Sequence, residues 1–254
     1  MSPTKILIGS LSVFICAAAA MPAAAQTSLY LRGDLGWAGA TNANIHDRNF
    51  PLDHAITGPN GAAGTLSDIG SGWLIGGGVG FQWSRNLRGD LVYTYRGDYH
   101  LDQVDDNTPP TLFKSDIHAH SVMANAYWDF PIDDSVAAFV GLGLGWSEVN
   151  FGNLSATSTL TINPLASTTA NGTTAVAPGS STDNFAWQIM AGLAFPLDTG
   201  ITMDLFYRYF DAGHFASAAG NVTINGNVVG TYAGAEGALH SHEIAVSVRF
   251  ATSL

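Results

Sequence analysis

Apolar and polar side chains alternate along the stretch from Ser71 to Tyr99, and this alternation predicts a β-hairpin. Successive side chains of a strand point to opposite faces, so a period of two is the pattern that a strand imposes. One face of the first strand carries Trp73, Ile75, Val79, Phe81 and Trp83, whereas the other face is mostly glycine, broken by Leu74. The second strand, after a turn at residues 84–86, sets Leu87, Leu91, Tyr93, Tyr95 and Tyr99 against Arg88, Asp90, Thr94, Arg96 and Asp98.

The large apolar face of this hairpin is predicted to point outward, toward lipid. Trp73 to Trp83 spans eleven residues, which at about 3.3 Å per residue and a tilt of about 40° stands roughly 28 Å tall, close to a bilayer core. A small barrel has little room inside for Trp and Tyr, whereas Gly76, Gly78 and Gly80 would clear space there for arginine. The alternative is a soluble, lipocalin-like barrel that buries the aromatic row and exposes the charges.

The same alternation recurs in six further segments, which predicts eight strands in all. These segments are residues 28–38, 115–130, 136–149, 184–195, 201–211 and 239–250, with Phe206 and Phe210 on the inner parity of the seventh strand. Three short turns alternate with four long loops at residues 39–69, 100–114, 150–183 and 212–237. We therefore predict an all-β fold, an eight-stranded antiparallel up-and-down transmembrane β-barrel whose eighth strand pairs with the first.

The first 25 residues have the form of a secretory signal peptide. Lys5 precedes an apolar run from Ile6 to Ala20, and small residues before Gln26 form an A-x-A cleavage site. We expect residues 1–25 to be removed and residues 26–254 to form one barrel domain, with a retained membrane helix as the alternative. The one cysteine, Cys16, lies inside this leader, so disulfide and thiol chemistry are not expected in the mature chain.

The net charge and the motifs of the sequence bear on nucleic-acid binding and on enzymatic activity. The chain has 9 basic and 20 acidic residues, and removal of Lys5 with the leader leaves a formal charge of −12, which argues against nucleic acid as a partner. We find no nucleophile elbow, phosphate-binding loop or Cys/His metal spacing, and no helix follows the glycines at 76–78. The chain is therefore predicted to be no enzyme and to hold no cofactor. The alternative is an acyltransferase that uses Ser and His on the loop side.

Ten charged residues fall on the face predicted to point inward. They are Arg32, Asp34, Arg88, Asp90, Arg96, Asp98, Asp204, Arg208, Glu243 and Arg249. Eight strands enclose a space about wide enough for side chains, and the two signs of charge are nearly balanced. We therefore interpret the set as an ion-paired polar network that fills the lumen, with a narrow charged pore as the alternative.

The histidines all map to the long loops or to the strand ends beside them. They are His46, His54, His100, His118, His120, His214, His240 and His242. His118 with His120, and His240 with His242, lie at i, i+2 and share a strand face, and Asp116 has the parity of the first pair. Because imidazoles with a carboxylate can bind zinc, copper or heme iron, these two pairs are the candidate metal ligands. The simpler interpretation is that histidine suits the head-group boundary, and the two pairs are expected on opposite sides of the barrel.

Eight segments of the chain together resemble a known family. They are LYLRGDLGW, GWLIGGGVGFQW, NLRGDLVYTYRG, MANAYWDFPID, AFVGLGLGW, FAWQIMAGLAF, MDLFYRYFDAG and HEIAVSVRF. In order and spacing they are similar to the strands of the small outer-membrane barrels of the OmpA-like and opacity-type porin superfamily, particularly RopB-like proteins. The resemblance implies an integral protein of the cell outer membrane with surface loops, and some relatives are adhesins, immunogens or heme binders. The chain departs from the family in ending Phe250-Ala-Thr-Ser-Leu254 rather than on an aromatic residue.

The sequence thus predicts a structural or surface-interaction role through four extracellular loops. A narrow porin for small solutes and surface binding of metal or heme are the alternatives. The predicted partners are the lipid bilayer, lipopolysaccharide, the barrel-assembly machinery and an extracellular ligand of the loops.

Overall fold

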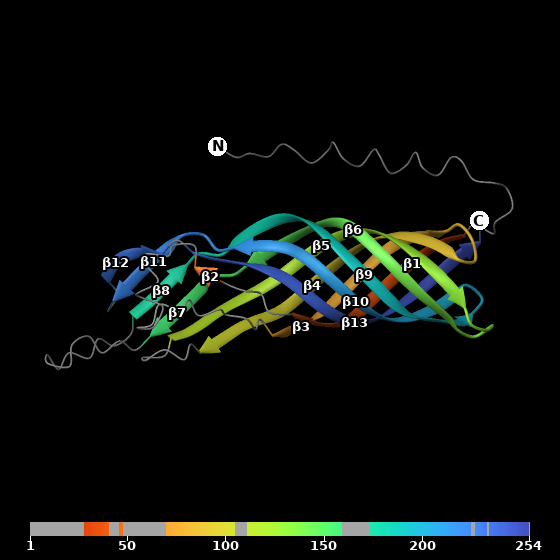
Figure 1. The fold of residues 1–254 in the computed structure, drawn as a ribbon, viewed down its shortest axis with the longest axis horizontal. Coiled ribbons are helices and arrows are strands. Elements are labelled where there is room, and N and C mark those ends of the chain that lie inside the picture. Colours follow the sequence, from red (N-terminus) through yellow and green to blue (C-terminus); the bar gives the residue numbers. More distant parts are fainter. Residues whose placement is uncertain are drawn as a thin grey trace, which may run out of the picture.

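Eight long antiparallel strands form a closed barrel (Figure 1). The computed structural model describes residues 28–40, 46–47, 70–104, 111–158, 173–224, 227–232 and 234–253, so the predicted leader lies outside the described residues. The barrel strands are β1 (Ser28–Ala40), β3 (Ser71–Gln82), β4 (Leu87–Val104), β5 (Thr111–Pro131), β6 (Ala137–Phe151), β9 (Ser180–Asp198), β10 (Ile201–Ala216) and β13 (Ala235–Ser253). Within the described ranges, no helix is long and apolar enough to cross a membrane.

Each barrel strand pairs with the next barrel strand along the chain, and the last pairs with the first. β13 runs antiparallel to β1 from Ser28 opposite Ser253 to Ala40 opposite Ser241. Short connections join β3 to β4, β5 to β6 and β9 to β10 at one end of the barrel, which we call the short-turn end. The predicted eight-stranded antiparallel barrel is confirmed. The last strand runs past Phe250, because Ala251 to Ser253 still pair with β1.

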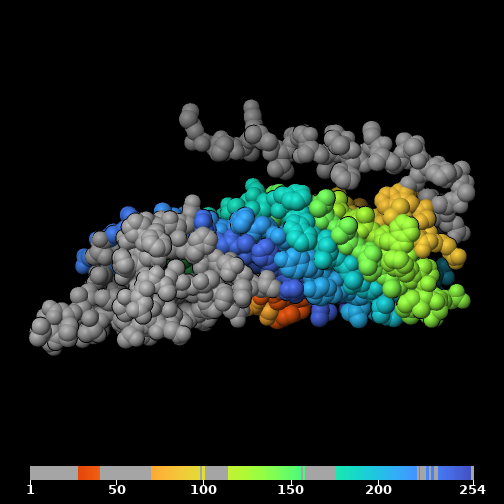
Figure 2. All heavy atoms as spheres, in the orientation of Figure 1, coloured from red at the N-terminus to blue at the C-terminus, as the bar shows by residue number. Residues whose placement is uncertain are grey.

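The outer face of the barrel is apolar. Phe185, Leu142 and Leu35 are 68%, 66% and 63% exposed, although a soluble protein would bury such side chains. In Figure 2 the strands from β5 to β10 form a continuous wall on the face in view. Exposed aromatic rings bound this band at both ends, with Trp37, Trp73, Trp146 and Trp187 far from the short turns and Trp128, Phe130 and Phe250 near them. This is the inverted pattern of a membrane barrel, so the lipocalin-like alternative is wrong.

Beyond the apolar band, regular structure continues farther than alternation predicted. Most of the predicted loop at residues 100–114 is strand, because β4 reaches Val104 and β5 begins at Thr111. The other predicted loops contain β2 (His46–Asp47), β7 (Leu154–Ser158), β8 (Thr173–Ala177), β11 (Gly220–Ile224) and β12 (Asn227–Tyr232). Backbone ladders hold β7, β8 and β11, each of which is only five residues long, too short for a period of two to stand out in the sequence.

These added strands continue the barrel wall into a single protruding sheet, at the left of Figure 1. β5 pairs with β7, β7 with β8, β8 with β11 and β11 with β12. We call this sheet, together with the barrel-strand ends that adjoin it, the outer extension. Its inward side chains are apolar and buried, among them Ile117, Val149, Phe151, Phe215 and Leu239. Phe151 stacks on Phe215 with ring centroids 5.1 Å apart and planes 12° apart, so the outer extension has an apolar core of its own.

A bulge in β4 overturns one predicted orientation. The sequence places Tyr99 on the outer face, but the pairing with β5 shifts between Arg96 and Tyr99. This extra residue changes the parity of the strand, and the Tyr99 side chain turns inward with 0% exposure. A Cβ on Gly97, within the bulge, would come within 2.7 Å of the Tyr95 ring. Glycine is therefore the residue that lets the strand pass this ring.

The apolar band predicts where a charge is costly. Leu91 of β4 points outward within the apolar band, so Leu91→Arg is expected to lower the free energy of unfolding in bilayers by about 2–4 kcal/mol. Val176 in β8 is also exposed but belongs to the outer extension, so Val176→Arg is the matched control and should change stability little. Urea titration of the barrels refolded into vesicles measures both. Equal destabilisation by the two substitutions would contradict the position of the band.

Candidate functional sites in the lumen and at the rim

Ten buried charges occupy the described barrel interior, in equal numbers of each sign. The cations are Arg32, Arg88, Arg96, Arg208 and Arg249, and the anions are Asp34, Asp90, Asp129, Asp204 and Glu243. The strands place them there because each has the inward parity of its strand, whereas large apolar side chains such as Leu31, Leu91 and Tyr207 have the outward parity. Taking a charge out of water costs several kcal/mol unless it is paired. The contacts made by these ten side chains therefore decide what the lumen can do.

Near the short turns, two arginines share two aspartates. Arg249 Nε lies 2.8 Å from Asp204 Oδ2, and Arg88 Nε lies 3.0 Å from Asp129 Oδ2. Arg88 Nη1 is also 3.7 Å from Asp204 Oδ2, which joins the two pairs. The Arg88 guanidinium lies between aromatic rings, 4.1 Å from the Tyr127 centroid and 4.7 Å from that of Phe139. Ion pairing and cation–π contact thus hold Arg88 across the lumen.

In the middle of the barrel, Arg32 bridges two carboxylates. Its Nε lies 2.9 Å from Asp34 Oδ1, and its Nη1 lies 2.7 Å from Asp90 Oδ2. Asn125 Nδ2 donates to Asp90 Oδ1 at 2.7 Å, and Gln188 Nε2 donates to Asn125 Oδ1 at 2.6 Å. This chain of hydrogen bonds crosses from β1 through β4 and β5 to β9. It links opposite walls of the barrel.

Toward the outer extension, one carboxylate is shared by two arginines. Arg96 Nε donates to Glu243 Oε1 at 2.6 Å, and Arg208 pairs with Glu243 Oε2. Ser241 Oγ donates to Glu243 Oε1 at 2.7 Å. The Arg96 guanidinium also stacks over the Phe210 ring, 3.6 Å from its centroid. Arg96 and Glu243 have 0% exposure, so both side chains are fully buried in the barrel wall and its interior.

Sequence reasoning located most of these charges but overlooked some of their partners. Asp129 shares the inner parity of Tyr127, a signal that could have added it to the predicted network. The Asp98 side chain, which was in that network, lies outside the described residues. The prediction that glycines in β3 make room for arginine is wrong at Gly80, where an added Cβ would lie 2.1 Å from the Tyr30 ring. Tyr30, rather than arginine, fills that space.

The rim histidines lie on the outer face of the barrel, where the apolar band ends. His118 and His120 project from β5 with ring centroids 5.9 Å apart, beside Tyr93 and Tyr95. His240 and His242 project from β13 beside Tyr207 and Tyr209. β5 and β13 are four strands apart in the ring of eight, so the two pairs are on opposite sides. Asp116, predicted as an oxygen ligand, instead pairs with His100, with 2.7 Å between Oδ1 and Nδ1.

The geometry of the rim gives no support to a metal site. Among the residues that the structure describes, no three His, Cys, Asp or Glu side chains converge as a metal site would require. His54 lies outside the described residues, and the same is true of the His46 side chain. The candidate ligands are engaged otherwise, since Tyr93 Oη and His120 Nδ1 are hydrogen-bonded at 2.6 Å. His242 is hydrogen-bonded to the Tyr207 hydroxyl in the same way, and His240 lies 3.4 Å from Asp211.

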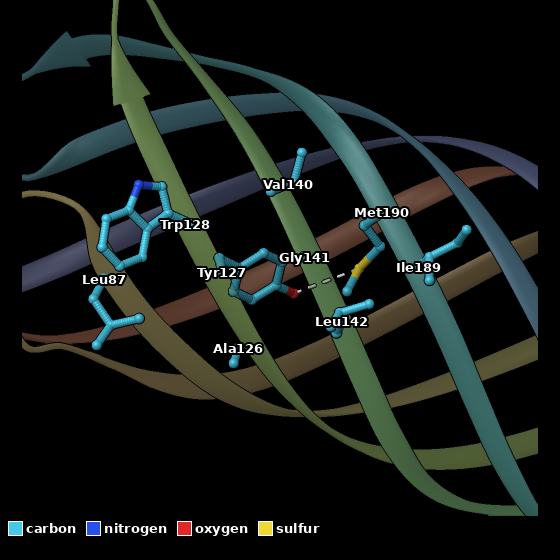
Figure 3. Close-up of a pocket in the computed structure, with 9 residues that line it drawn as sticks. All are labelled: Leu87, Ala126, Tyr127, Trp128, Val140, Gly141, Leu142, Ile189 and Met190. Atoms are coloured by element: carbon cyan, nitrogen blue, oxygen red, sulfur yellow. Dashed lines mark hydrogen bonds between the residues drawn. The ribbon is translucent and has the colours of Figure 1, made fainter.

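A shallow apolar pocket lies on the outer wall of β5, β6 and β9 (Figure 3). Outward side chains of Trp128, Leu142 and Ile189 line it together with Gly141, whose own Cβ position points inward, 2.6 Å from the Tyr127 ring. Behind it, the inward Tyr127 hydroxyl donates to Met190 Sδ at 3.7 Å. The pocket faces the apolar band, so lipid chains are its natural occupants and it presents no catalytic group.

Comparison with known proteins places this architecture in a family. Residues 8–250 match the family described as outer membrane protein beta-barrel domain. The chain belongs to this family. The protein is therefore an outer-membrane protein. The family assignment confirms the predicted localisation and the resemblance found in the sequence.

Individual relatives share only a small fraction of identical residues with this chain. The chain is 26% identical to "Outer membrane protein PagN" of Salmonella typhimurium over 204 residues, which cover 75% of this chain and 77% of that one. Among solved structures it is similar to Neisserial surface protein A, with 15% identity, a TM-score of 0.48 and coverage of 88% and 97% of the two chains. It is also similar to the Yersinia pestis attachment invasion locus protein Ail, with 12% identity, a TM-score of 0.39 and coverage of 87% and 98%.

The shared carboxylate yields a stability prediction. Glu243→Gln removes the charge that pairs with both Arg96 and Arg208, and leaving buried charges unpaired costs about 3–5 kcal/mol. Asp116→Asn is the matched control, because this side chain is 79% exposed and surface pairs contribute about 0–1 kcal/mol. Urea unfolding of both variants in vesicles measures the difference. A Glu243→Gln barrel as stable as the control would show that the interior charges contribute nothing to folding.

Proposed function

We propose that this protein is a closed outer-membrane barrel that holds the outer extension as a surface for interaction with an extracellular partner. The observation that carries the proposal is the apolar core of the extension, where Phe151 and Phe215 stack above the charged lumen. A loop that only connects strands needs no such core. An interaction surface benefits from one, because a rigid surface loses less conformational entropy when it binds.

The described strands of the extension also suit a neutral partner better than a charged one. β7, β8, β11 and β12 contain no charged residue and are rich in Ser, Thr, Asn and Val. Val176 and Val228 are exposed on them. Uncharged hydroxyl and amide groups around exposed apolar side chains are the composition of a protein-binding surface. We therefore favour another protein as the partner.

The contacts in the lumen favour a closed barrel over the alternative of a narrow porin. Arg88, Arg96 and Glu243 have no exposed surface, and aromatic rings lie against both arginines. A conducting pore would need hydrated charges along its length. The ion-paired network is accordingly proposed to fill the lumen, and no catalytic role is proposed for it.

Conductance distinguishes the closed barrel from a porin. The refolded protein in a planar bilayer is expected to show no steady channels. A variant with Arg88→Gly, Tyr127→Ala and Phe139→Ala opens only the layer near the short turns and should show none either, because the layers around Arg32 and Glu243 still cross the lumen. Both proteins are compared at equal amounts in the same salt, and steady channels in the unaltered protein would favour the porin.

Removal of the outer sheet tests the interaction role. Replacing residues 220–232, which form β11 and β12, by a short glycine turn leaves every barrel strand intact. Bacteria that display this variant are expected to adhere to cultured epithelial cells several-fold less than bacteria that display the full chain. The control is the Asp134→Asn variant, an exposed position in the turn between β5 and β6 at the short-turn end, and surface amounts are matched by antibody. Equal adherence of the shortened and full proteins would argue against the proposal.

A further inference from the structure

Two groups of five outward side chains on opposite sides of the barrel have the same composition. The first rim cluster is Trp73, Tyr93, Tyr95, His118 and His120, on β3, β4 and β5. The second rim cluster is Trp187, Tyr207, Tyr209, His240 and His242, on β9, β10 and β13. Each consists of a tryptophan on one strand, Tyr-x-Tyr on the next and His-x-His on the third.

The two clusters also share their register and contacts. Tyr95 is opposite His120, and Tyr209 is opposite His242. The Trp–Tyr centroid distances are 5.2 and 5.4 Å, and the Tyr–His distances across the strands are 5.0 and 5.3 Å. In each cluster the other tyrosine is hydrogen-bonded through its hydroxyl to Nδ1 of that histidine.

The two clusters differ in the inward residues that adjoin the cluster positions. This difference indicates why their outward residues are alike. Leu74 follows Trp73 where Gln188 follows Trp187, and Arg96 follows Tyr95 where Phe210 follows Tyr209. A repeated unit kept only for folding would match on both faces. The match is confined to the face that points away from the barrel, so the cause lies in the surroundings. What surrounds a barrel on opposite sides at the same level is the lipid leaflet.

The polar groups of the clusters define the chemistry that fits them. With the tyrosine hydroxyl donating to Nδ1, the neutral imidazole carries its proton on Nε2, and within the described residues Nε2 of His120 and His242 makes no hydrogen bond. A carboxylate lies beside each cluster, since Glu148 is opposite His120, and Asp211, opposite His240, also accepts from Trp187 Nε1 at 3.0 Å. A fixed donor, a carboxylate and exposed ring faces together suit a ligand with many hydroxyl groups.

We propose that each rim cluster binds the sugar head group of a glycolipid in the outer leaflet. The aromatic rings lie against the sugar, Nε2–H of His120 or His242 donates to a hydroxyl or phosphate oxygen, and the neighbouring carboxylate accepts from a hydroxyl. A phosphate alone fits less well, because Glu148 and Asp211 would repel it. This inference assigns residues to the predicted lipopolysaccharide contact and does not depend on the outer extension.

Native mass spectrometry of the refolded barrel tests the proposal with purified lipid A as the probe and phosphatidylethanolamine as the sugar-free comparison. We expect two lipid A molecules per barrel, bound at least tenfold more tightly than the phospholipid. His120→Phe keeps an aromatic ring but loses the donor, and should weaken one site about tenfold, the effect of losing one hydrogen bond. The double variant with His242→Phe should weaken both sites.

Two further measurements distinguish loss of binding from misfolding and a membrane glycolipid from a free sugar. Tyr93→Phe with Tyr207→Phe leaves the rings and frees Nδ1, so weaker binding by this pair, with normal heat-modifiable mobility on gels, repeats the test without altering the histidines. The free glucosamine disaccharide of lipid A should bind far more weakly than the lipid, because it lacks the membrane anchor. Equal affinity for lipid A and phosphatidylethanolamine, unchanged binding in the double histidine variant, or equal binding of the free disaccharide would overturn the proposal.

Discussion

A backbone amide or carbonyl that faces lipid must be hydrogen-bonded within the protein, and the rest of this structure depends on that constraint. It requires the sheet to close, which β13 achieves by pairing with β1 along the whole of β1. It also requires the connections between strands, such as the three short turns at one end of the barrel, to lie beyond the apolar band. Lipid then selects the outward side chains, so that Leu35 and Leu142 lie where a soluble protein would place charges.

Closure leaves a lumen too narrow for bulk water, and charged side chains there can persist only as pairs. Burying an ion pair is a weak source of stability compared with apolar packing, so the interior charges do not explain why the barrel folds. Their arrangement does restrict how it folds. Arg32 and Glu243 each bridge partners from different strands, and a register slip of one residue would separate charges and turn some of them toward lipid.

Much of this fold could be predicted from the sequence, because inward and outward residues of a membrane barrel differ in polarity and alternate along each strand with a period of two. The eight strands and the outward Trp, Tyr and Leu rows followed from that period. The bulge before Tyr99 could not, since one extra residue breaks the period without a distinctive sequence. The short strands of the outer extension could not be located from the sequence for a related reason. They are held by backbone ladders between segments far apart in the chain, such as β8 and β11.

The candidate sites were predictable to different degrees. Alternation brought Arg32, Asp90 and Glu243 to the inner face, but it could not say which charges would meet, because that depends on stagger between strands. Tyr30 shows the limit clearly, since its ring occupies the space above Gly80 that arginine was expected to take. The rim histidines were recognised as pairs, whereas their hydrogen bonds to Tyr93 and Tyr207 depend on cross-strand register.

The change of the inward face, from charged within the membrane to apolar beyond it, gives the molecule two interiors that respond to different solvents. The core around Phe151 and Phe215 buries apolar side chains away from water, as the core of a soluble domain does. Its exposure should account for much of the heat-capacity change of unfolding. The charged interior is enclosed by a wall whose stability comes from lipid. Cooling and heating therefore change chiefly the stability of the outer extension. Changes of bilayer thickness or detergent change chiefly the stability of the barrel within the membrane.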